Sequence, residues 1–391
     1  MSETTTIESR LSQRARDIVP FEVMQIIEQA NALERQGVDI IHLEVGEPKF
    51  PTAPSVLARV QAFLAHQPAR YTEAAGQPDL RLAIAQDYQR RFQIDINPER
   101  IVVTQGASAA LLLAMGAILD PGDEILMADP AYPCNRQFAR FVDASARLIK
   151  AGPAESYQLT ADSIEAQWQS STRAALVATP SNPTGTLVAK SQLREIQARI
   201  AVHQGHLIVD EIYQGLSYEG DPSTAADLPD TWVVNSFSKY AGMTGWRLGW
   251  LICPEGAQRA VTNMAQHLYI SPSQIAQVAG LASFEPDAIA EFEVRREQLR
   301  QARDYLVPAL ESLGFVIDAT PAGAYYLFVD VRQLSDDAVA LAQRLLVEAG
   351  VATTPGSDFG PAYAHSHLRI AYVDSLPRLQ LAVERMRQVL V

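Results

Sequence analysis

The sequence predicts an α/β protein with two domains: a large domain built on a mostly parallel, seven-stranded, doubly wound sheet, and a smaller α+β domain. Three features support this fold class. β-rich runs alternate with helical patterns from about residue 100, several of those runs are apolar throughout, and the pattern changes after about residue 285. Such alternation is typical of parallel sheets that carry helices on both faces, so that the strands are buried on both sides.

Seven short runs are expected to form the large sheet. They are IVVT (101–104), EILMA (124–128), ARLIKA (146–151), AALVAT (174–179), HLIVDE (206–211), WVVNS (232–236) and LGWLIC (248–253). Turns and helical patterns, for example at 107–119 and 191–201, separate these runs. The last two runs are joined only by a glycine-rich loop with no room for a crossover helix, so the last strand should be antiparallel.

A different order of elements follows residue 285. A long charged helix (289–314) precedes an apolar run (315–331), a second helix (336–349), the strand HLRIAYV (367–373) and a final helix. This is an α+β pattern. The sequence therefore predicts three parts: residues 1–45, with one helix near 22–36, which pack on the small domain; residues 46–285, the large domain; and residues 286–391, the small domain.

The composition of the 391-residue chain argues against several classes of protein. It is 48% hydrophobic and 20% charged, as globular proteins are, and its net charge of −13 disfavours a general nucleic-acid binder. No apolar run approaches the roughly 18 residues of a membrane helix, and the polar N-terminus lacks the apolar core of a signal peptide. The chain has two cysteines, Cys134 and Cys253, so no disulfide framework is expected and a cytoplasmic location fits.

In open α/β sheets, ligands bind beyond the carboxyl ends of the strands, so the residues that follow each predicted strand are site candidates. After the first strand, Gly106, Ala107 and Ser108 begin a helix whose free N–H groups could hold a phosphate. Taken alone, this segment is better explained by ordinary strand–turn–helix packing. No G-x-G-x-x-G or Walker motif indicates a nucleotide.

The segment SFSKYAGMTGWRLG, after the sixth strand, places one lysine, Lys239, among small residues. Arg247 and the hydroxyls of Ser236 and Ser238 are groups that suit a phosphate dianion. Cationic surroundings lower the pKa of a lysine and make its amine a nucleophile. This segment therefore combines a reactive amine with a phosphate cradle.

Three further side chains complete the candidate site. Asp210 closes the fifth strand, where it could cap a helix or could pair with a protonated ring nitrogen. Tyr213 follows three residues later, and Asn182 lies in SNPTG, where it could also be a plain turn residue. A lysine, a phosphate cradle, an aspartate and two donors for a phenolic oxygen together indicate pyridoxal 5'-phosphate, with Lys239 as its Schiff-base lysine.

At this point the chain resembles a known family. SFSKYAGMTGWRLG is similar to the lysine-attachment motif of the class I/II aminotransferases, in the aspartate-aminotransferase-like branch of the fold-type-I pyridoxal-phosphate enzymes. The other matching segments occur in family order over nearly the whole chain: LEVGEPKFPT, RYTEAAGQPDLR, VTQGASAAL, ADPAYP, SNPTG, VDEIYQGLSY and HLRIAYV. Each segment is modest evidence alone, but their order is strong evidence.

The resemblance implies roles for the residues around the cofactor. Lys239 would form the Schiff base and carry the proton, Asp210 would keep the ring nitrogen protonated, and Tyr132 would stack on the ring. Asn182 and Tyr213 would bind the phenolic oxygen. The phosphate would be held by the backbone at Gly106, Ala107 and Ser108 and by Ser236, Ser238 and Arg247. No metal is expected.

The resemblance also implies how substrate and a second subunit would contribute. Arg369 would bind the substrate α-carboxylate, with Asn182 and the backbone of Gly46. Tyr71 would reach the phosphate of the neighbouring subunit, which implies a homodimer with composite active sites. The partners are then amino acids and 2-oxo acids, with glutamate and 2-oxoglutarate expected as one pair and a neutral or broad range of amino acids as the other.

Two alternatives keep the same cofactor. A carbon–sulfur β-lyase shares the SNPTG and DEIY segments, so the motifs do not separate it cleanly from an aminotransferase. A pyridoxal-phosphate-sensing regulator would need a basic DNA-binding module, whereas the segment before GEPKF has only about 45 residues and is too short and too acidic for one. The preferred amino acid is not evident from the sequence; Phe21, Lys49, Tyr71 and Tyr325–Tyr326 are candidates for the side-chain pocket.

Overall fold

The computed structural model describes residues 7, 10–18, 20–219 and 223–390. Its largest sheet has seven strands in the order β2-β8-β7-β6-β5-β3-β4. The bounds are β2 (Ile101–Thr104), β3 (Glu124–Asp129), β4 (Ser145–Lys150), β5 (Thr172–Ala178), β6 (His206–Asp210), β7 (Thr231–Ser236) and β8 (Gly249–Ile252). Strand β8 is antiparallel to both of its neighbours, and the remaining pairs are parallel. The predicted α/β class and the reversed last strand are confirmed.

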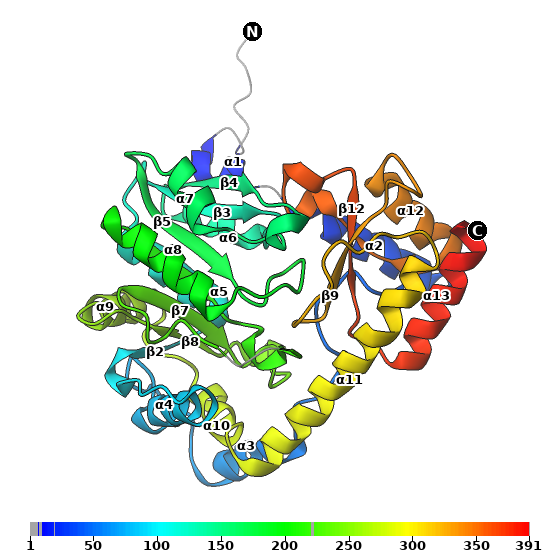
Figure 1. Ribbon diagram of the computed structural model, residues 1–391. Coiled ribbons are helices and arrows are strands. Elements are labelled where there is room, and N and C mark those ends of the chain that lie inside the picture. Colours follow the sequence, from blue (N-terminus) through cyan, green and yellow to red (C-terminus); the bar gives the residue numbers. More distant parts are fainter. Residues whose placement is uncertain (1–6, 8–9, 19, 220–222, 391) are drawn as a thin grey trace.

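Helices cover both faces of this sheet (Figure 1). They are α3 (Pro54–His66), α4 (Pro78–Phe92), α5 (Gly106–Ile118), α6 (Pro133–Phe141), α7 (Ala161–Gln167), α8 (Lys190–Val202), α9 (Gln258–Tyr269) and α10 (Gln274–Ala282). Successive strand residues face opposite sides, so Ile101 and Val103 belong to one hydrophobic core and Val102 to another. Both faces are therefore apolar, which explains the continuous apolar runs in the sequence.

A second group of elements contains a three-stranded antiparallel sheet in the order β11-β12-β9. The elements of this group are α11 (Pro286–Glu311), β9 (Tyr326–Asp330), α12 (Ala338–Ala349), β10 (Val351–Ala352), β11 (Thr354–Pro355), β12 (His367–Ala371) and α13 (Leu376–Leu390). Short 3₁₀ turns are η2 (Pro98–Arg100), η3 (Pro153–Glu155), η4 (Gln214–Leu216), η5 (Thr244–Trp246), η6 (Gly356–Asp358) and η7 (Pro361–Tyr363). Figure 1 shows α11 running from α3 and α10 to α13, so this helix joins the two groups.

The N-terminal segment contains α1 (Gln13–Asp17), α2 (Glu22–Arg35) and β1 (Ile41–His42), of which only α2 is expected from the sequence. Strand β1 pairs in parallel with β10. Ile26 and Ala30 of α2 form a small core with Leu346 and Ala352. These contacts hold α2 against the second group of elements. The domain boundaries at residues 45 and 285 stay a prediction.

No helix in the part of the chain that the structure describes has both the length and the apolar character to cross a membrane.

Candidate active site

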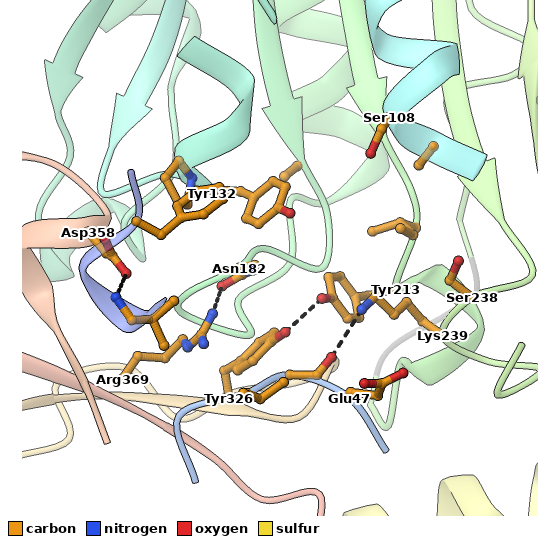
Figure 2. A pocket seen from close by; sticks show the side chains of 18 of the residues that line it. Glu47, Ser108, Tyr132, Asn182, Tyr213, Ser238, Lys239, Tyr326, Asp358 and Arg369 are labelled. Carbon is orange, nitrogen blue, oxygen red and sulfur yellow. Dashed lines mark hydrogen bonds between the residues drawn. The ribbon is translucent and has the colours of Figure 1, made fainter. Parts of the chain in front are cut away.

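A cavity of about 360 Å³ lies at the carboxyl ends of the large-sheet strands and is closed by β12 and α2. Figure 2 shows side chains from both groups of elements pointing into it. Pockets of this size accept small ligands. The cavity is lined by most of the residues that the sequence singles out: Gly46, Ala107, Ser108, Tyr132, Asn182, Asp210, Tyr213, Ser238, Lys239, Arg247 and Arg369. Gly106, Ser236 and Tyr71 are not among its lining residues.

Lys239 lies just beyond the end of β7, and its amine projects into the cavity (Figure 2). Its Nζ donates a hydrogen bond to the Gly46 carbonyl oxygen at 3.0 Å. Burial of the amine and the positive charges of Arg369 and Arg247 lower the pKa of Lys239 to about 8, although Glu47 and Asp210 act in the opposite direction. A substantial fraction of this amine is therefore neutral, and nucleophilic, near pH 8.

Asp210 ends β6 and is buried at the floor of the cavity. One carboxylate oxygen accepts a hydrogen bond from the Ile212 N–H at 3.1 Å, and burial raises the pKa of Asp210 to about 6. A buried carboxylate with so few partners is costly unless a cation approaches it. Asp210 is thus suited to pair with a positively charged ligand atom.

The candidate phosphate cradle forms where α5 begins opposite Arg247. Gly106 has φ +78°, and an added Cβ there would lie 2.8 Å from Arg247 Nη2, so this position requires glycine. Arg247 itself has left-handed backbone angles (φ 51°, ψ 54°), which cost a non-glycine residue on the order of 1–2 kcal/mol. Backbone strain at a charged side chain that faces a helix N-terminus is typical of a ligand site.

Two hydroxyls lie beside this cradle. Ser236 Oγ donates to Ser238 Oγ at 2.8 Å and is 2.9 Å from the Leu248 carbonyl oxygen. Ser238 lines the cavity, whereas Ser236 lies behind it. The structure thus places Ser236 as a support for Ser238, and direct phosphate contact by Ser236 stays a prediction.

Arg369, on β12, is buried at the other end of the cavity. Its Nη1 donates to Asn182 Oδ1 at 3.0 Å, and its Nη2 donates to the Glu44 carbonyl oxygen. Its guanidinium carbon lies 4.5 Å from the ring centre of Tyr326 and 4.9 Å from that of Phe359. Within the part of the chain that the structure describes, its Nε has no hydrogen-bond partner. A buried guanidinium without a carboxylate partner is poised to bind an anion.

The aromatic group around Arg369 is a feature whose geometry the sequence does not reveal. Tyr326 OH is 2.8 Å from Tyr213 OH, and Tyr325 OH donates to the Gly46 carbonyl oxygen at 2.8 Å. A Cβ on Gly46 would lie only 1.7 Å from Tyr326 OH, so Gly46 is required for this approach. The doublet Tyr325–Tyr326 is the only sequence signal for these contacts.

Four further residues line the cavity that the sequence did not single out: Met24, Ile27, Glu44 and Asp358. Phe21, which the sequence did suggest for the side-chain pocket, also lines it. Asp358 accepts hydrogen bonds from the N–H groups of Glu22 and Val23, at 2.7 and 3.0 Å, and so caps α2. These partners are more than 330 positions apart in the chain. No local pattern could have paired them.

Other candidates lie outside the cavity. Tyr71 is 80% exposed and borders a surface groove with Arg70, Gln105 and Ser271. Lys49 forms an ion pair with Asp374 at 2.6 Å, and Arg136 donates to the Asp358 carbonyl oxygen at 2.9 Å. Tyr71 therefore cannot be assigned to the cavity of its own chain, and neither Lys49 nor Arg136 lines that cavity.

The residues present fit pyridoxal 5'-phosphate on structural grounds. A glycine cradle faces Arg247 and the start of α5, a buried Asp210 lacks a cationic partner, and an amine with a lowered pKa lies in the same cavity. Tyr132 caps α6 and lines the cavity from the side, where a ring could stack against it. The cradle with Arg247 thus matches a phosphate, the Asp210 carboxylate matches a protonated ring nitrogen, and the Lys239 amine matches an aldehyde.

Comparison with known proteins agrees with this arrangement. Residues 38–385 match the family "Aminotransferase class I and II". The chain is 36% identical to the valine–pyruvate aminotransferase of Mycobacterium tuberculosis, over 96% of this chain and 97% of that one. It is 36% identical to the aspartate/prephenate aminotransferase of Thermus thermophilus, over 97% and 98%.

Solved structures show the same likeness. The crystal structure of an aminotransferase from Mycobacterium tuberculosis superposes with a TM-score of 0.93 at 36% identity, covering 97% of this chain and 99% of that one. An aspartate aminotransferase from Thermus thermophilus in a structure with maleate superposes with a TM-score of 0.92 at 34% identity, covering 97% and 99%. The chain therefore belongs to the class I and II aminotransferases and is an enzyme that depends on pyridoxal phosphate.

Proposed function

We propose that this enzyme moves an amino group between an L-amino acid and a 2-oxo acid, with the cofactor attached to Lys239 as a Schiff base. The observation that carries the proposal is the position of two cations in one cavity. Lys239, with a pKa lowered to about 8, and Arg369, buried and without a carboxylate partner, both line it. An amine nucleophile beside an anion clamp is what an α-amino acid requires.

When bound, the cofactor supplies an electron sink for the bonds at the substrate Cα. The residues proposed to hold it are those of the cradle and the ring pocket. Arg247, Ser238 and the first N–H groups of α5 bind the phosphate, Asp210 keeps a proton on the ring nitrogen, and Tyr132 packs against the ring. Asn182 and Tyr213 donate to the phenolic oxygen. Ser236 positions Ser238.

Arg369 binds the substrate α-carboxylate and so fixes the Cα next to Lys239. Asn182 holds the guanidinium in place through its bond to Nη1, and the Tyr326 ring covers it. Lys239 Nζ takes the proton from the substrate Cα, because a neutral amine is available near pH 8. The same amine then delivers that proton to the cofactor carbon. The Gly46 carbonyl oxygen holds the Lys239 amine in position for both proton transfers by accepting a hydrogen bond from it.

We also propose a homodimer with composite sites, in which Tyr71 reaches the phosphate of the neighbouring subunit. Its support is the 80% exposure of Tyr71 and its distance in the fold from the lining of its own cavity. Glutamate and 2-oxoglutarate are the pair expected from the resemblance. No lining residue is assigned to a second carboxylate, so this pair stays a prediction.

The test is to add amino acids one at a time to the cofactor-loaded enzyme without an acceptor, and to record its absorbance. Transamination converts the cofactor to its amine form and releases one equivalent of 2-oxo acid. β-Elimination would instead release ammonia and a 2-oxo acid continuously, and a sensor would bind the amino acid without product. Absence of the amine form with every amino acid tested would exclude the proposed function.

A further inference from the structure

The substrate end of the cavity has an apolar wall that no core of the protein uses. It consists of Phe21, just before α2, and of Val23, Met24 and Ile27 within it. At 100° per residue, the three helical positions fall within one 100° arc of α2. Among the described residues, none of the four belongs to a hydrophobic core cluster, and Met24 is 46% exposed. This arc lies next to the positions of Ile26 and Ala30, which pack on α12 and β10, and does not overlap them.

The wall is held close to the α-carboxylate clamp. Asp358 caps the first N–H groups of α2, and the next residue, Phe359, packs on the Arg369 guanidinium. Figure 2 shows Asp358 beside the start of α2, on the Arg369 side of the cavity. A substrate whose carboxylate is bound by Arg369 therefore has this wall within reach of its side chain.

The charges that line the cavity leave no cation for a second carboxylate. Its cationic lining residues, within the described ranges, are Lys239, Arg247 and Arg369, and each has a role in the proposed function. Its acidic lining residues include Glu44, which is fully buried; one carboxylate oxygen lies 2.7 Å from His42 Nδ1, and the other has no partner among the described residues. A substrate carboxylate on this wall would contact apolar groups and would find no cationic partner among the described lining residues, which is unfavourable.

We infer that the wall of Phe21, Val23, Met24 and Ile27 selects amino acids with apolar side chains and disfavours aspartate and glutamate. The inference rests on the proposed function and deepens it by naming the substrate class. An apolar side chain gains free energy from the area it buries on this wall, whereas a carboxylate loses its hydration without gaining a partner. Glutamate is then a poor donor, against the expectation from the resemblance.

Leucine and aspartate provide the sharpest test, because their side chains have similar shapes and differ in charge. We expect the second-order rate constant for conversion of the cofactor to its amine form to be at least about tenfold higher with leucine. A rate constant for aspartate equal to or above that for leucine would overturn the inference. It would mean that a neighbouring subunit supplies a cation to this end of the cavity.

The variant Met24→Lys places a cation on the wall with a side chain of similar length at an exposed position, so the fold should be kept. We expect the leucine-to-aspartate ratio to fall at least about fivefold, because the new ammonium pairs with the aspartate side chain. The matched control is Gln25→Lys, which adds the same charge to the same turn of α2 but does not line the cavity. An equal change in both variants would contradict the inference.

A binding readout separates this inference from the proposed function. Isocaproate and succinate are leucine and aspartate without the amino group, and neither can react. By calorimetry on the cofactor-loaded enzyme, isocaproate should bind more tightly than succinate, and Met24→Lys should narrow the difference. If no amino acid is converted but isocaproate is still preferred, the proposed function fails and the apolar wall stands. If amino acids are converted but succinate is preferred, the wall assignment fails alone.

Discussion

The two ends of the cavity are built in different ways. The cofactor end, formed by Ala107, Ser108, Asp210, Ser238, Lys239 and Arg247, uses residues at or near the ends of strands of the large sheet. The substrate end, formed by Phe21, Met24, Ile27, Gly46, Tyr326 and Arg369, joins segments from near the beginning and near the end of the chain. The first depends on local motifs and the second on tertiary packing.

The largest effect should come from the cofactor end. Lys239→Ala removes both the covalent attachment and the proton carrier, so we expect turnover to fall by at least about 10³-fold. The cofactor should still bind through the cradle, which equilibrium dialysis would measure. Lys49→Ala, at an exposed ion pair outside the cavity, is the control. Near-normal turnover in Lys239→Ala would show that another amine acts.

Asp210→Asn keeps a hydrogen bond to the ring nitrogen but removes the charge that holds its proton. We expect kcat to fall by about 10²-fold or more with a smaller change in cofactor affinity. Asp227→Asn, in a surface ion pair with Lys190, controls for loss of one negative charge. A kcat within about threefold of wild type, less than roughly 0.7 kcal/mol, would rule out the role at the ring nitrogen.

At the substrate end, Arg369→Lys keeps the charge and loses the planar fork. We expect kcat/KM to fall by about 10²-fold for every amino acid alike, mainly through KM, because the α-carboxylate is common to all substrates. Arg136→Lys is the matched control, since Arg136 donates to the Asp358 carbonyl oxygen but does not line the cavity. A fall in kcat/KM confined to one substrate would contradict the role of Arg369 in binding the α-carboxylate.

The lowered pKa of Lys239 predicts how the unloaded protein takes up its cofactor. Only the neutral amine attacks an aldehyde, so the rate of uptake should rise with pH through a midpoint at about 8 and level off above it. Stopped-flow absorbance would give this profile. Because the charge of Arg369 contributes to the shift, Arg369→Leu should move the midpoint to higher pH. An unchanged midpoint in that variant would show that the charge of Arg369 does not influence the pKa of Lys239.

The smallest effect is expected for Tyr71→Phe, which removes one hydrogen bond to a charged group and should weaken cofactor affinity by about tenfold. Mixed dimers test whether that bond crosses the subunit boundary. When Tyr71→Phe subunits are combined with Lys239→Ala subunits, each mixed dimer should regain one intact site, with normal affinity. No gain on mixing, or a fully active monomer by sedimentation, would count against composite sites.

Much of the large sheet could be predicted because its strands are buried on both faces. All seven predicted runs coincide with strands to within a few residues, and the short gap before β8 correctly indicates its direction. The elements missed include α1 and the two-residue strands β1, β10 and β11. Such short elements depend on tertiary partners, as β11 depends on β12, and carry no periodicity of their own.

The candidate site likewise contains residues that local sequence predicts and contacts that depend on tertiary packing. Strand-end residues such as Asp210 and Lys239 could be proposed from the sequence, because topology brings the ends of parallel strands together. The close approach of Gly46 to Tyr326 and the capping of α2 by Asp358 could not, because each joins residues hundreds of positions apart. Both depend on how the second group of elements packs on the first.

The antiparallel pairing of β7 with β8 has a consequence for how the site tolerates change. Ser236 pairs with Gly249, so Lys239 and Arg247 both belong to the loop of a single hairpin. Their separation is set by the number of residues in that loop and not by the docking of distant elements. An extra residue between them would leave every strand pair of the sheet intact while moving the amine away from the anion-binding guanidinium. Because Ala241 and Met243 of the same loop are buried in the large hydrophobic core, an insertion there would change core packing as well as the position of the amine.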